Sequence, residues 1–385
     1  MKFGNLFLLP FLTFLQFSAL AQGITDLKDI NTALTEKAFS GNLIIAQGGQ
    51  IVFQQQYGIA NREQKIAYDK DTVFGIGSVT KQFVATAILK LQEQGKLSVN
   101  DTLESFFDNV PEDKKAISVH HLLTQSSGFM ANFDKEPLYG LMPHSSLPQR
   151  AFDTKLVFSP GESYAYSNIG YSLLARIIEK VSGQNWEAYI RQNILLPAGL
   201  SYTGYRLPKY ERNKLAINYG ADQNAFQRMF KIKAKSKSVG HSLSHLLKKP
   251  GERWFEGAGG FLSTQDDMFK WYLAIRDQQV LTEQSWNLMH SPHVKENPEQ
   301  NWFYGYGWAI TELNEHDRIT HNGSNGYNFA EFSYFPDLDL FIFVSTNDID
   351  NYPEETINSI YKFIVAKNNS PEVAIQSASA RDRLY

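Results

Sequence analysis

A serine stands three residues before a lysine at two places in this sequence. Ser78 precedes Lys81 in the stretch FGIGSVTKQF, and Ser359 precedes Lys362 near the C-terminus. Residues three apart on a helix share a face, so either lysine could reach its serine hydroxyl. A neutral lysine amine can take the proton of a serine and turn the serine into a nucleophile. Because a chain of this length contains roughly one or two such matches by chance, the surrounding sequence has to decide which pair is chemical.

The pair near the C-terminus lies on the polar side of a predicted helix. The segment PEETINSIYKFIVAK has apolar side chains at helical spacing, namely Ile357, Ile360, Tyr361 and Ile364. Ser359 and Lys362 fall on the opposite face, which predicts that water surrounds both. We therefore interpret this pair as part of a solvated surface.

The first pair has a different setting. Ser78 follows the flexible residues 75–77 and opens a predicted helix that is largely apolar and ends at Gly95. A buried helix N-terminus would strip water from the Lys81 ammonium and add positive potential, and both effects lower a lysine pKa. The Ser78 N–H would point outward there as one donor to an oxyanion. The alternative is that Ser78 merely caps the helix, as serine often does.

The sequence lacks the motifs of several other chemistries. It has no Gly-x-Ser-x-Gly elbow, no His-Glu-x-x-His and no phosphate-binding loop. It has no cysteine, which excludes thiol chemistry and disulfides, and its net charge of -3 comes without a basic domain for nucleic acid. The adjacent His120 and His121 are predicted to point apart on a helix, which disfavours a metal site. We expect neither a metal nor an organic cofactor.

Strand signals lie at both ends of the chain and helix signals in the middle. Residues 41–61 predict a hairpin around Gly48-Gly49. Further strands are predicted at 305–313, 318–323, 327–335 and 338–346, with a turn at Pro336-Asp337. Helices are predicted at 119–125, 171–181 and 186–195, and a last one from Pro353. This order predicts an α+β fold: an antiparallel sheet built from both chain ends, flanked by helices, with a largely helical region inserted.

The N-terminus has the features of a secretory signal. One lysine, an apolar run of about a dozen residues and Ala19-Leu20-Ala21 follow one another in MKFGNLFLLPFLTFLQFSALAQG. Pro10 and Gln16 interrupt the run, which is short of the roughly 20 apolar residues of a membrane span. We expect a signal peptide at 1–21 cleaved near Ala21, one domain at 22–368 and a disordered tail at 369–385. The protein would be exported, periplasmic or secreted, without a stable membrane span.

Three short motifs stand in a fixed order along the chain. SVTK covers Ser78 to Lys81, YSN covers Tyr166 to Asn168, and HNG covers His321 to Gly323. This order resembles the serine β-lactamase and penicillin-binding-protein superfamily, and within it the branch of class C β-lactamases, D-Ala-D-Ala carboxypeptidases and esterases. Flanking stretches such as HLLTQSSGF, GAGGFLST and YGYGW match the branch too. The resemblance runs from about Gly41 to Ile364 and implies a β-lactamase/transpeptidase-like fold.

The resemblance implies a role for each residue of the first two motifs. Ser78 would attack the substrate, while Lys81 and Tyr166 would move protons. Asn168 would bind the Lys81 side chain or a substrate amide. The alternatives are a buried core tyrosine at 166 and a helix-capping asparagine at 168.

The third motif departs from the lactamase pattern. Gly323 would let a substrate approach the strand backbone, and the Ser324 N–H would be the second oxyanion donor. His321 stands where lactamases and most carboxypeptidases carry lysine. Because a free histidine charges only below about pH 6.5, we expect weak binding of substrate carboxylates that strengthens as the pH falls. A structural histidine at the end of a strand is the alternative.

These observations predict an exported serine hydrolase that forms an acyl-serine intermediate on an ester, amide or D-amino-acid peptide bond. A D-Ala-D-Ala carboxypeptidase and a β-lactamase proper stay open, as does a non-catalytic protein that binds penicillin or cell-wall peptides. We expect the protein to act on a small-molecule or peptide substrate and not to bind nucleic acid. The sequence leaves the acyl substrate and the oligomeric state open. The lysine-rich stretch 230–241 is expected to be a solvated hairpin or loop, or a cationic flap over an anionic substrate.

Overall fold

The computed structural model describes residues 26–220, 236–244 and 248–368. The signal peptide expected at 1–21 and the tail expected at 369–385 lie outside the described residues, as do residues 230–235 of the lysine-rich stretch. Within the described ranges, no helix is both long and apolar enough to cross a membrane.

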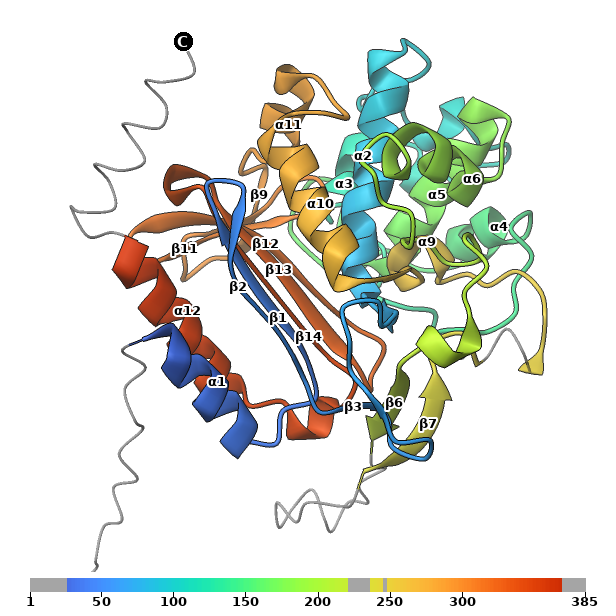
Figure 1. The fold of residues 1–385 in the computed structure, drawn as a ribbon. Helices are drawn as coiled ribbons and strands as arrows, with labels where there is room; N and C mark the ends of the chain where they lie inside the picture. The colour runs from blue at the N-terminus through green and yellow to red at the C-terminus, as the bar shows by residue number, and fades with distance from the viewer. Residues whose placement is uncertain (1–25, 221–235, 245–247, 369–385) are drawn as a thin grey trace, which may run out of the picture.

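One antiparallel sheet combines strands from the N-terminal part and from the C-terminal part of the described chain (Figure 1). Its strand order is β2-β1-β14-β13-β12-β11-β10-β9. The strands are β1 (Gly41–Gln47), β2 (Gln50–Tyr57), β9 (Val294–Asn297), β10 (Trp302–Tyr304), β11 (Ala309–Leu313), β12 (His316–Ser324), β13 (Phe329–Phe335) and β14 (Leu340–Thr346). The predicted α+β fold with a sheet built from both chain ends is confirmed.

The register shows how the two ends meet. Strand β1 pairs with β14 from Gly41 opposite Thr346 to Gln47 opposite Leu340. The predicted hairpin between β1 and β2 is present, and Gly48-Gly49 form its turn, both with positive φ. Consequently the first strand of the chain completes its hydrogen bonding only against the last one.

The two faces of the sheet are covered by different parts of the chain. Alternate side chains of a strand point to opposite faces, so Leu43 and Ile45 of β1 face one layer and Ile44 the other. The terminal helices α1 (Leu27–Glu36) and α12 (Glu354–Asn368) cover the first face. The inserted helical region covers the second face. There the ring of Tyr272 in α10 (Gln265–Arg276) stacks on the ring of Phe341, with 4.8 Å between the ring centroids. Figure 1 shows the three layers.

The inserted region is mainly helical, as predicted. Its helices are α2 (Thr80–Glu93), α3 (Val119–Leu123), α4 (Leu147–Phe152), α5 (Asn168–Ser182), α6 (Trp186–Ile190), α9 (Glu256–Gly259), α10 and α11 (Glu283–Met289). Short strand pairs that the sequence did not predict lie among them: β3 (Ile59–Asn61) with β4 (Ile66–Ala67), β5 (Phe74–Gly75) with β8 (Leu262–Ser263), and β6 (Ile217–Gly220) with β7 (Lys237–His241). Runs of two to five residues are too short to show a hydrophobic period. The described part of the lysine-rich stretch is thus mostly strand β7.

The strand predicted at 305–313 is wrong in its first four residues. Residues 305–308 form a loop between β10 and β11, and Gly307 has a φ of 79°. A Cβ at Gly307 would lie 2.8 Å from the Lys81 carbonyl oxygen, so the loop passes directly against α2. The close approach to the helix, and not the hydrophobic pattern, decides the backbone here.

Candidate active site

Ser78 lies in a short 3-10 helix, η1 (Gly77–Val79), and α2 begins two residues after it at Thr80. The expectation that Ser78 itself opens the helix is therefore slightly wrong. The residue at the N-cap of α2 is Val79, which makes no side-chain capping hydrogen bond. Ser78 is half-buried and is not a helix cap, so that alternative falls away.

Two glycines allow the turn that carries Ser78 to sit against strand β12. Gly77 has a φ of 50°, and a Cβ on it would lie 2.4 Å from the Ser324 main-chain nitrogen. A Cβ at Gly323 would lie 2.5 Å from the Ser78 main-chain nitrogen. Both distances are shorter than real Cβ contacts, so only glycine fits at either position. The contact places the turn at Gly77 and Ser78 directly against Gly323 and Ser324 of β12.

The Lys81 side chain is fully buried and its amine has three polar neighbours. The nitrogen Nζ lies 3.1 Å from Ser78 Oγ, 2.8 Å from Asn168 Oδ1 and 2.6 Å from the carbonyl oxygen of Ala258. No carboxylate of the described residues forms an ion pair with it. Burial without a countercharge disfavours the ammonium and holds the pKa of the Lys81 amine well below its usual value.

The neighbours of Lys81 fix the direction of its lone pair. A neutral amine has two N–H bonds and one lone pair. The oxygens of Asn168 and Ala258 can only accept hydrogen bonds from it, so they take both hydrogens. The lone pair is then left to face the Ser78 hydroxyl, which is the arrangement that a general base requires.

Tyr166 lies in the loop that leads into α5, and Asn168 is the first residue of that helix. The Tyr166 ring centroid is 4.7 Å from Lys81 Nζ. Asn168 accepts from Lys81 through Oδ1 and donates through Nδ2 to Asn132 at 2.9 Å. Ser167 caps α5 instead by accepting from the Gly170 N–H at 3.1 Å, so Asn168 is not the capping residue.

Tyr166 is a neutral phenol in this environment. Burial raises the pKa of its hydroxyl, and the hydrogen bond with Ser78 acts in the opposite direction but is the weaker effect. A phenol keeps its proton at neutral pH and can give it to a leaving group. Tyr166 thus lies beside Ser78 as a phenol that keeps its proton, and Lys81 as a buried amine whose charged form is disfavoured.

His321 does not behave as the sequence led us to expect. Its Nδ1 lies 2.6 Å from the Asn322 carbonyl oxygen, so this nitrogen carries the hydrogen and donates. Its Nε2 then accepts from the Tyr304 hydroxyl at 2.9 Å. Burial, together with Lys81, lowers the pKa of the imidazole to about 3. The expectation that His321 charges near pH 6.5 is wrong, because the ring is buried and both nitrogens are already engaged.

Two partners at this site were not predicted. Ala258 offers only a main-chain carbonyl, and Tyr304 is the last residue of β10 in an aromatic-rich stretch, so neither has a side-chain signature of catalysis. Both belong to stretches that match the superfamily, GAGGFLST and YGYGW, and this was the available signal. Glu296 was missed too: its carboxylate accepts from the Tyr164 hydroxyl at 3.0 Å, and burial raises its pKa.

The adjacent histidines His120 and His121 lie close to each other in the structure. Contrary to expectation, the rings of His120 and His121 meet, with centroids 5.9 Å apart. His120 Nδ1 lies 2.7 Å from the Tyr306 hydroxyl. Across the residues that the structure describes, no group of three or more histidine, aspartate or glutamate side chains is arranged to hold a metal ion.

Comparison with known proteins gives a consistent result. The family model described as β-lactamase matches residues 27–367. The chain is 26% identical over 330 residues to penicillin-binding protein 4* of Bacillus subtilis, covering 83% of this chain and 70% of that protein. It is 30% identical over 282 residues to the putative penicillin-binding protein PbpX of the same organism, covering 73% and 64%. The solved octameric penicillin-binding protein homologue from Pyrococcus abyssi superposes with a TM-score of 0.74 at 26% identity, covering 90% and 78%.

Proposed function

The chain belongs to the β-lactamase family, and we propose that it is a serine hydrolase that works through a covalent acyl-serine intermediate. One observation carries the proposal: the Lys81 amine is buried without a countercharge, 3.1 Å from Ser78 Oγ. Burial favours the neutral form of this amine, and the neutral form can accept the serine proton. A lysine with only a structural role would have no advantage from being buried without a countercharge beside a serine hydroxyl.

In the first half of the proposed reaction, Ser78 Oγ attacks the substrate carbonyl carbon while its proton passes to Lys81 Nζ. The N–H groups of Ser78 and Ser324 stabilise the resulting oxyanion. The bond to the leaving group then breaks, and the leaving group takes a proton from Tyr166, which Lys81 replaces. In the second half, water attacks the acyl carbon and passes a proton to Lys81. The bond between that carbon and Ser78 Oγ breaks, and Lys81 returns the proton to Ser78 Oγ as the acid is released.

We propose an ester, an amide or a D-amino-acid peptide as the substrate, in preference to penicillin-like carboxylates. The support is electrostatic. His321 supplies no cation near neutral pH because its pKa is about 3, and burial disfavours the charged form of Lys81. A substrate carboxylate would therefore meet no permanent positive charge from these two residues.

Binding of penicillin or cell-wall peptides without useful turnover is the second candidate, and D-Ala-D-Ala cleavage or β-lactam hydrolysis is a variant of the first. The names of the relatives favour them, since two are called penicillin-binding proteins. The complete proton path through Lys81 and Tyr166 favours turnover.

We also propose that the protein is exported, with cleavage near Ala21 leaving a mature N-terminus at about residue 22. N-terminal sequencing of the protein secreted by its host tests this.

The experiment that separates the candidates follows the acyl-enzyme by intact mass. Nitrocefin, a short p-nitrophenyl ester, a D-Ala-D-Ala peptide and a D-amino-acid amide are each mixed with wild type and Ser78→Ala. We expect a transient adduct and multiple turnovers with the ester or amide, and no adduct on Ser78→Ala. A stable adduct with all four compounds, without turnover, would instead establish the binding protein.

A further inference from the structure

The short helix α9 carries one of the acceptors of Lys81. It runs from Glu256 to Gly259, and the carbonyl oxygen of Ala258 in it accepts from Lys81 Nζ at 2.6 Å. The last carbonyl groups of a helix have no partner inside the helix, which leaves this oxygen free for Lys81. A single helical turn is not stable by itself, so other contacts have to fix the position of the carbonyl.

Glu256 anchors α9 through its carboxylate. The side chain is fully buried, and three donors meet its two oxygens. Oε1 accepts from the Arg253 main-chain N–H at 2.6 Å, while Oε2 accepts from the Arg206 guanidinium at 2.7 Å and from His144 Nε2 at 3.2 Å. Burial acts to raise the pKa of the Glu256 carboxyl, but the bonds from His144 and Arg206 outweigh burial and lower it. The carboxyl group is therefore ionised and uses both oxygens.

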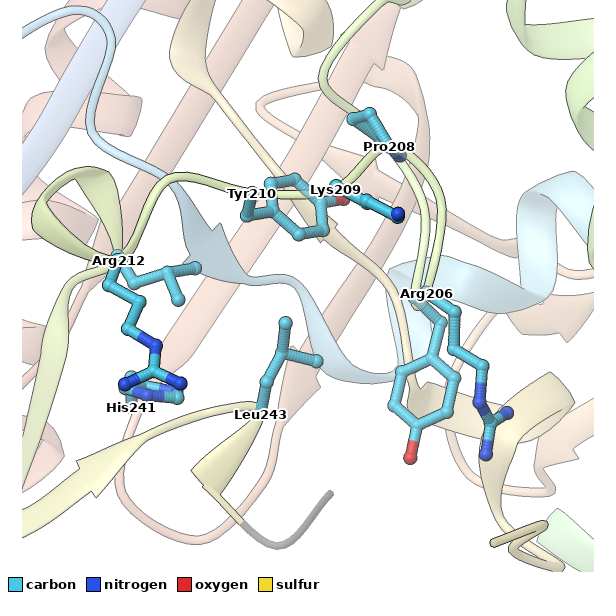
Figure 2. A pocket seen from close by; sticks show the side chains of 9 residues that line it. Arg206, Pro208, Lys209, Tyr210, Arg212, His241 and Leu243 are labelled. Atoms are coloured by element: carbon cyan, nitrogen blue, oxygen red, sulfur yellow. The ribbon is translucent and has the colours of Figure 1, made fainter. Parts of the chain in front are cut away.

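The three donors come from separate parts of the chain. Arg253 lies three positions before the carboxylate that it contacts, whereas Arg206 lies 50 and His144 112 positions before it. Figure 2 shows the Arg206 side chain directed away from Arg212 and His241, two other residues that line the same cavity. One carboxylate therefore ties two distant segments to α9.

His144 extends these contacts to helix α5. Its Nδ1 lies 3.3 Å from Glu179 of α5 and 3.5 Å from Glu252. Burial acts to lower the pKa of this imidazole, but the surrounding carboxylates outweigh burial and raise it. Because α5 begins with Asn168, the buried charges connect both elements that supply an acceptor to Lys81.

Packing leaves α9 little room to shift. A Cβ at Gly257 would lie 2.5 Å from the Cβ of Ala175 in α5. A Cβ at Gly259 would lie 3.5 Å from the main-chain carbon of Gly77, in the turn that carries the candidate nucleophile. Helix α9 thus fills the space between α5 and this turn, and the Glu256 carboxylate holds it there from the side.

We propose that Glu256 is a positioning residue, which fixes the Ala258 carbonyl so that this oxygen keeps its hydrogen bond with Lys81. Without that bond, Asn168 holds only one of the two amine hydrogens. The other can then turn toward the Ser78 hydroxyl in place of the lone pair, and the amine no longer faces the serine as a base. The effect on catalysis rests on the proposed function, whereas the effect on the Lys81 amine does not depend on turnover.

The variant Glu256→Gln tests the effect on catalysis. An amide has one accepting oxygen for donors at both ends, so one side of the cluster loses its acceptor. Turnover of a short p-nitrophenyl ester is divided by the concentration of sites that a fluorophosphonate labels, so that unfolded protein is not counted. We expect kcat per labelled site to fall about tenfold or more while KM stays within about twofold. A kcat per site equal to that of wild type would overturn the assignment.

Asp348 provides a matched control away from α9. Its buried carboxylate also receives three donors on two oxygens: the Arg62 guanidinium, the Asn351 amide at 2.9 Å and the Ser236 hydroxyl at 3.1 Å. Asp348→Asn disturbs a comparable charge and should leave kcat per labelled site within about twofold of wild type. A loss as large as that of Glu256→Gln would show general loosening of the fold and would refute positioning.

The Lys81 signal in NMR spectra gives a reading that needs no catalysis. In protein labelled with ¹³C-lysine, the Cε signal of Lys81 is assigned with Lys81→Met. We expect this signal to move in Glu256→Gln and to stay in place in Asp348→Asn. If wild type neither labels nor turns over, the hydrolase proposal fails, and this signal still decides the role of Glu256.

A milder variant covers the case in which Glu256→Gln does not fold. Arg206→Met removes a partly exposed donor and leaves the carboxylate with its other two. We expect about threefold lower kcat per labelled site and a Lys81 signal that moves. A Lys81 signal that stays in place in both variants would overturn the assignment.

Discussion

A serine stands three residues before a lysine at two places in this molecule, and the surroundings of the two pairs are opposite. Lys81 is buried, and its amine contacts Ser78, Asn168 and the carbonyl of Ala258. Lys362 is exposed on α12, and the Ser359 hydroxyl donates to the Glu355 carbonyl of its own helix at 2.9 Å. Spacing brings a lysine near a serine in both cases. Only the first lysine has the burial and the two fixed acceptors that the proposed base requires, so the environment and not the pattern distinguishes the two pairs.

The largest expected effect tests this contrast directly. Ser78→Ala should abolish covalent labelling by a fluorophosphonate and reduce kcat/KM by about three orders of magnitude or more, because the nucleophile is gone. Ser359→Ala should change neither, since its hydroxyl serves only its own helix. Labelling is measured by intact mass. Labelling that survives in Ser78→Ala would break the contrast between the two pairs.

The next prediction tests whether the buried Lys81 and Tyr166 act in one proton path. Lys81→Ala and Tyr166→Phe should each reduce kcat about a hundredfold or more, because base and acid serve one proton path. The double variant should lose far less than the product of the two single losses, since residues that act as a unit are not additive. Steady-state kinetics on one ester substrate measure all three. Independent, fully multiplicative losses would show two separate proton paths.

A third prediction concerns stability against pH. Burial holds the pKa of Lys81 well below the 10.5 of a free lysine, so the unfolded chain binds more protons at this position than the folded chain. Wild-type stability should therefore rise relative to Lys81→Met as the pH increases from 7 toward 10, by up to about 1.4 kcal/mol per pH unit. Urea unfolding at several pH values measures the difference.

The second lysine gives the control for this experiment. Lys362→Met replaces an exposed side chain and should stay within about 0.5 kcal/mol of wild type across the same pH range. Parallel pH curves for wild type and Lys81→Met would mean that Lys81 stays charged in the folded protein, and the base assignment would be lost.

The smallest effect extends the comparison to a third basic side chain, His321. Its pKa of about 3 keeps it neutral from pH 5 to 8. The ratio of kcat/KM for a carboxylate-bearing substrate to that for a neutral ester should then change less than about twofold over this range. His321→Lys should raise the ratio about tenfold, the value of one charge-assisted hydrogen bond. A wild-type ratio that climbs as the pH falls toward 5 would show that His321 does titrate there.

The sequence predicted the residues of the site better than their properties. Ser78, Tyr166 and Asn168 lie in linear motifs, so resemblance was enough to find them and the structure brings them together. The Ala258 carbonyl was not predictable, because a main-chain oxygen 177 positions from Lys81 leaves no trace in residue types. The low pKa of His321 was missed for a related reason: it comes from burial and from the nearby Lys81, which only the fold brings close.

The fold was predictable where its elements are long. The hairpin at 41–61, the strands around 318–346 and the last helix have enough residues to show a hydrophobic period. Strands β9 and β10 and the short pairs β5–β8 and β6–β7 do not, and β5 also depends on a partner strand far along the chain. The loop at 305–308 was mistaken for a strand because contact with α2, and not the local pattern, sets its backbone.

The placement of β14 between β1 and β13 has a consequence for biosynthesis. Asn42 and Ser345 bond each other across 303 positions of sequence, so the first strand to leave the ribosome waits for one of the last. Contacts this remote slow folding and leave early strands unpaired while translation continues. The chain therefore carries its serine and lysine long before it has the strand against which they pack. A prematurely terminated product would contain Ser78 and Lys81 but no assembled site, and catalysis could begin only after translation is nearly complete.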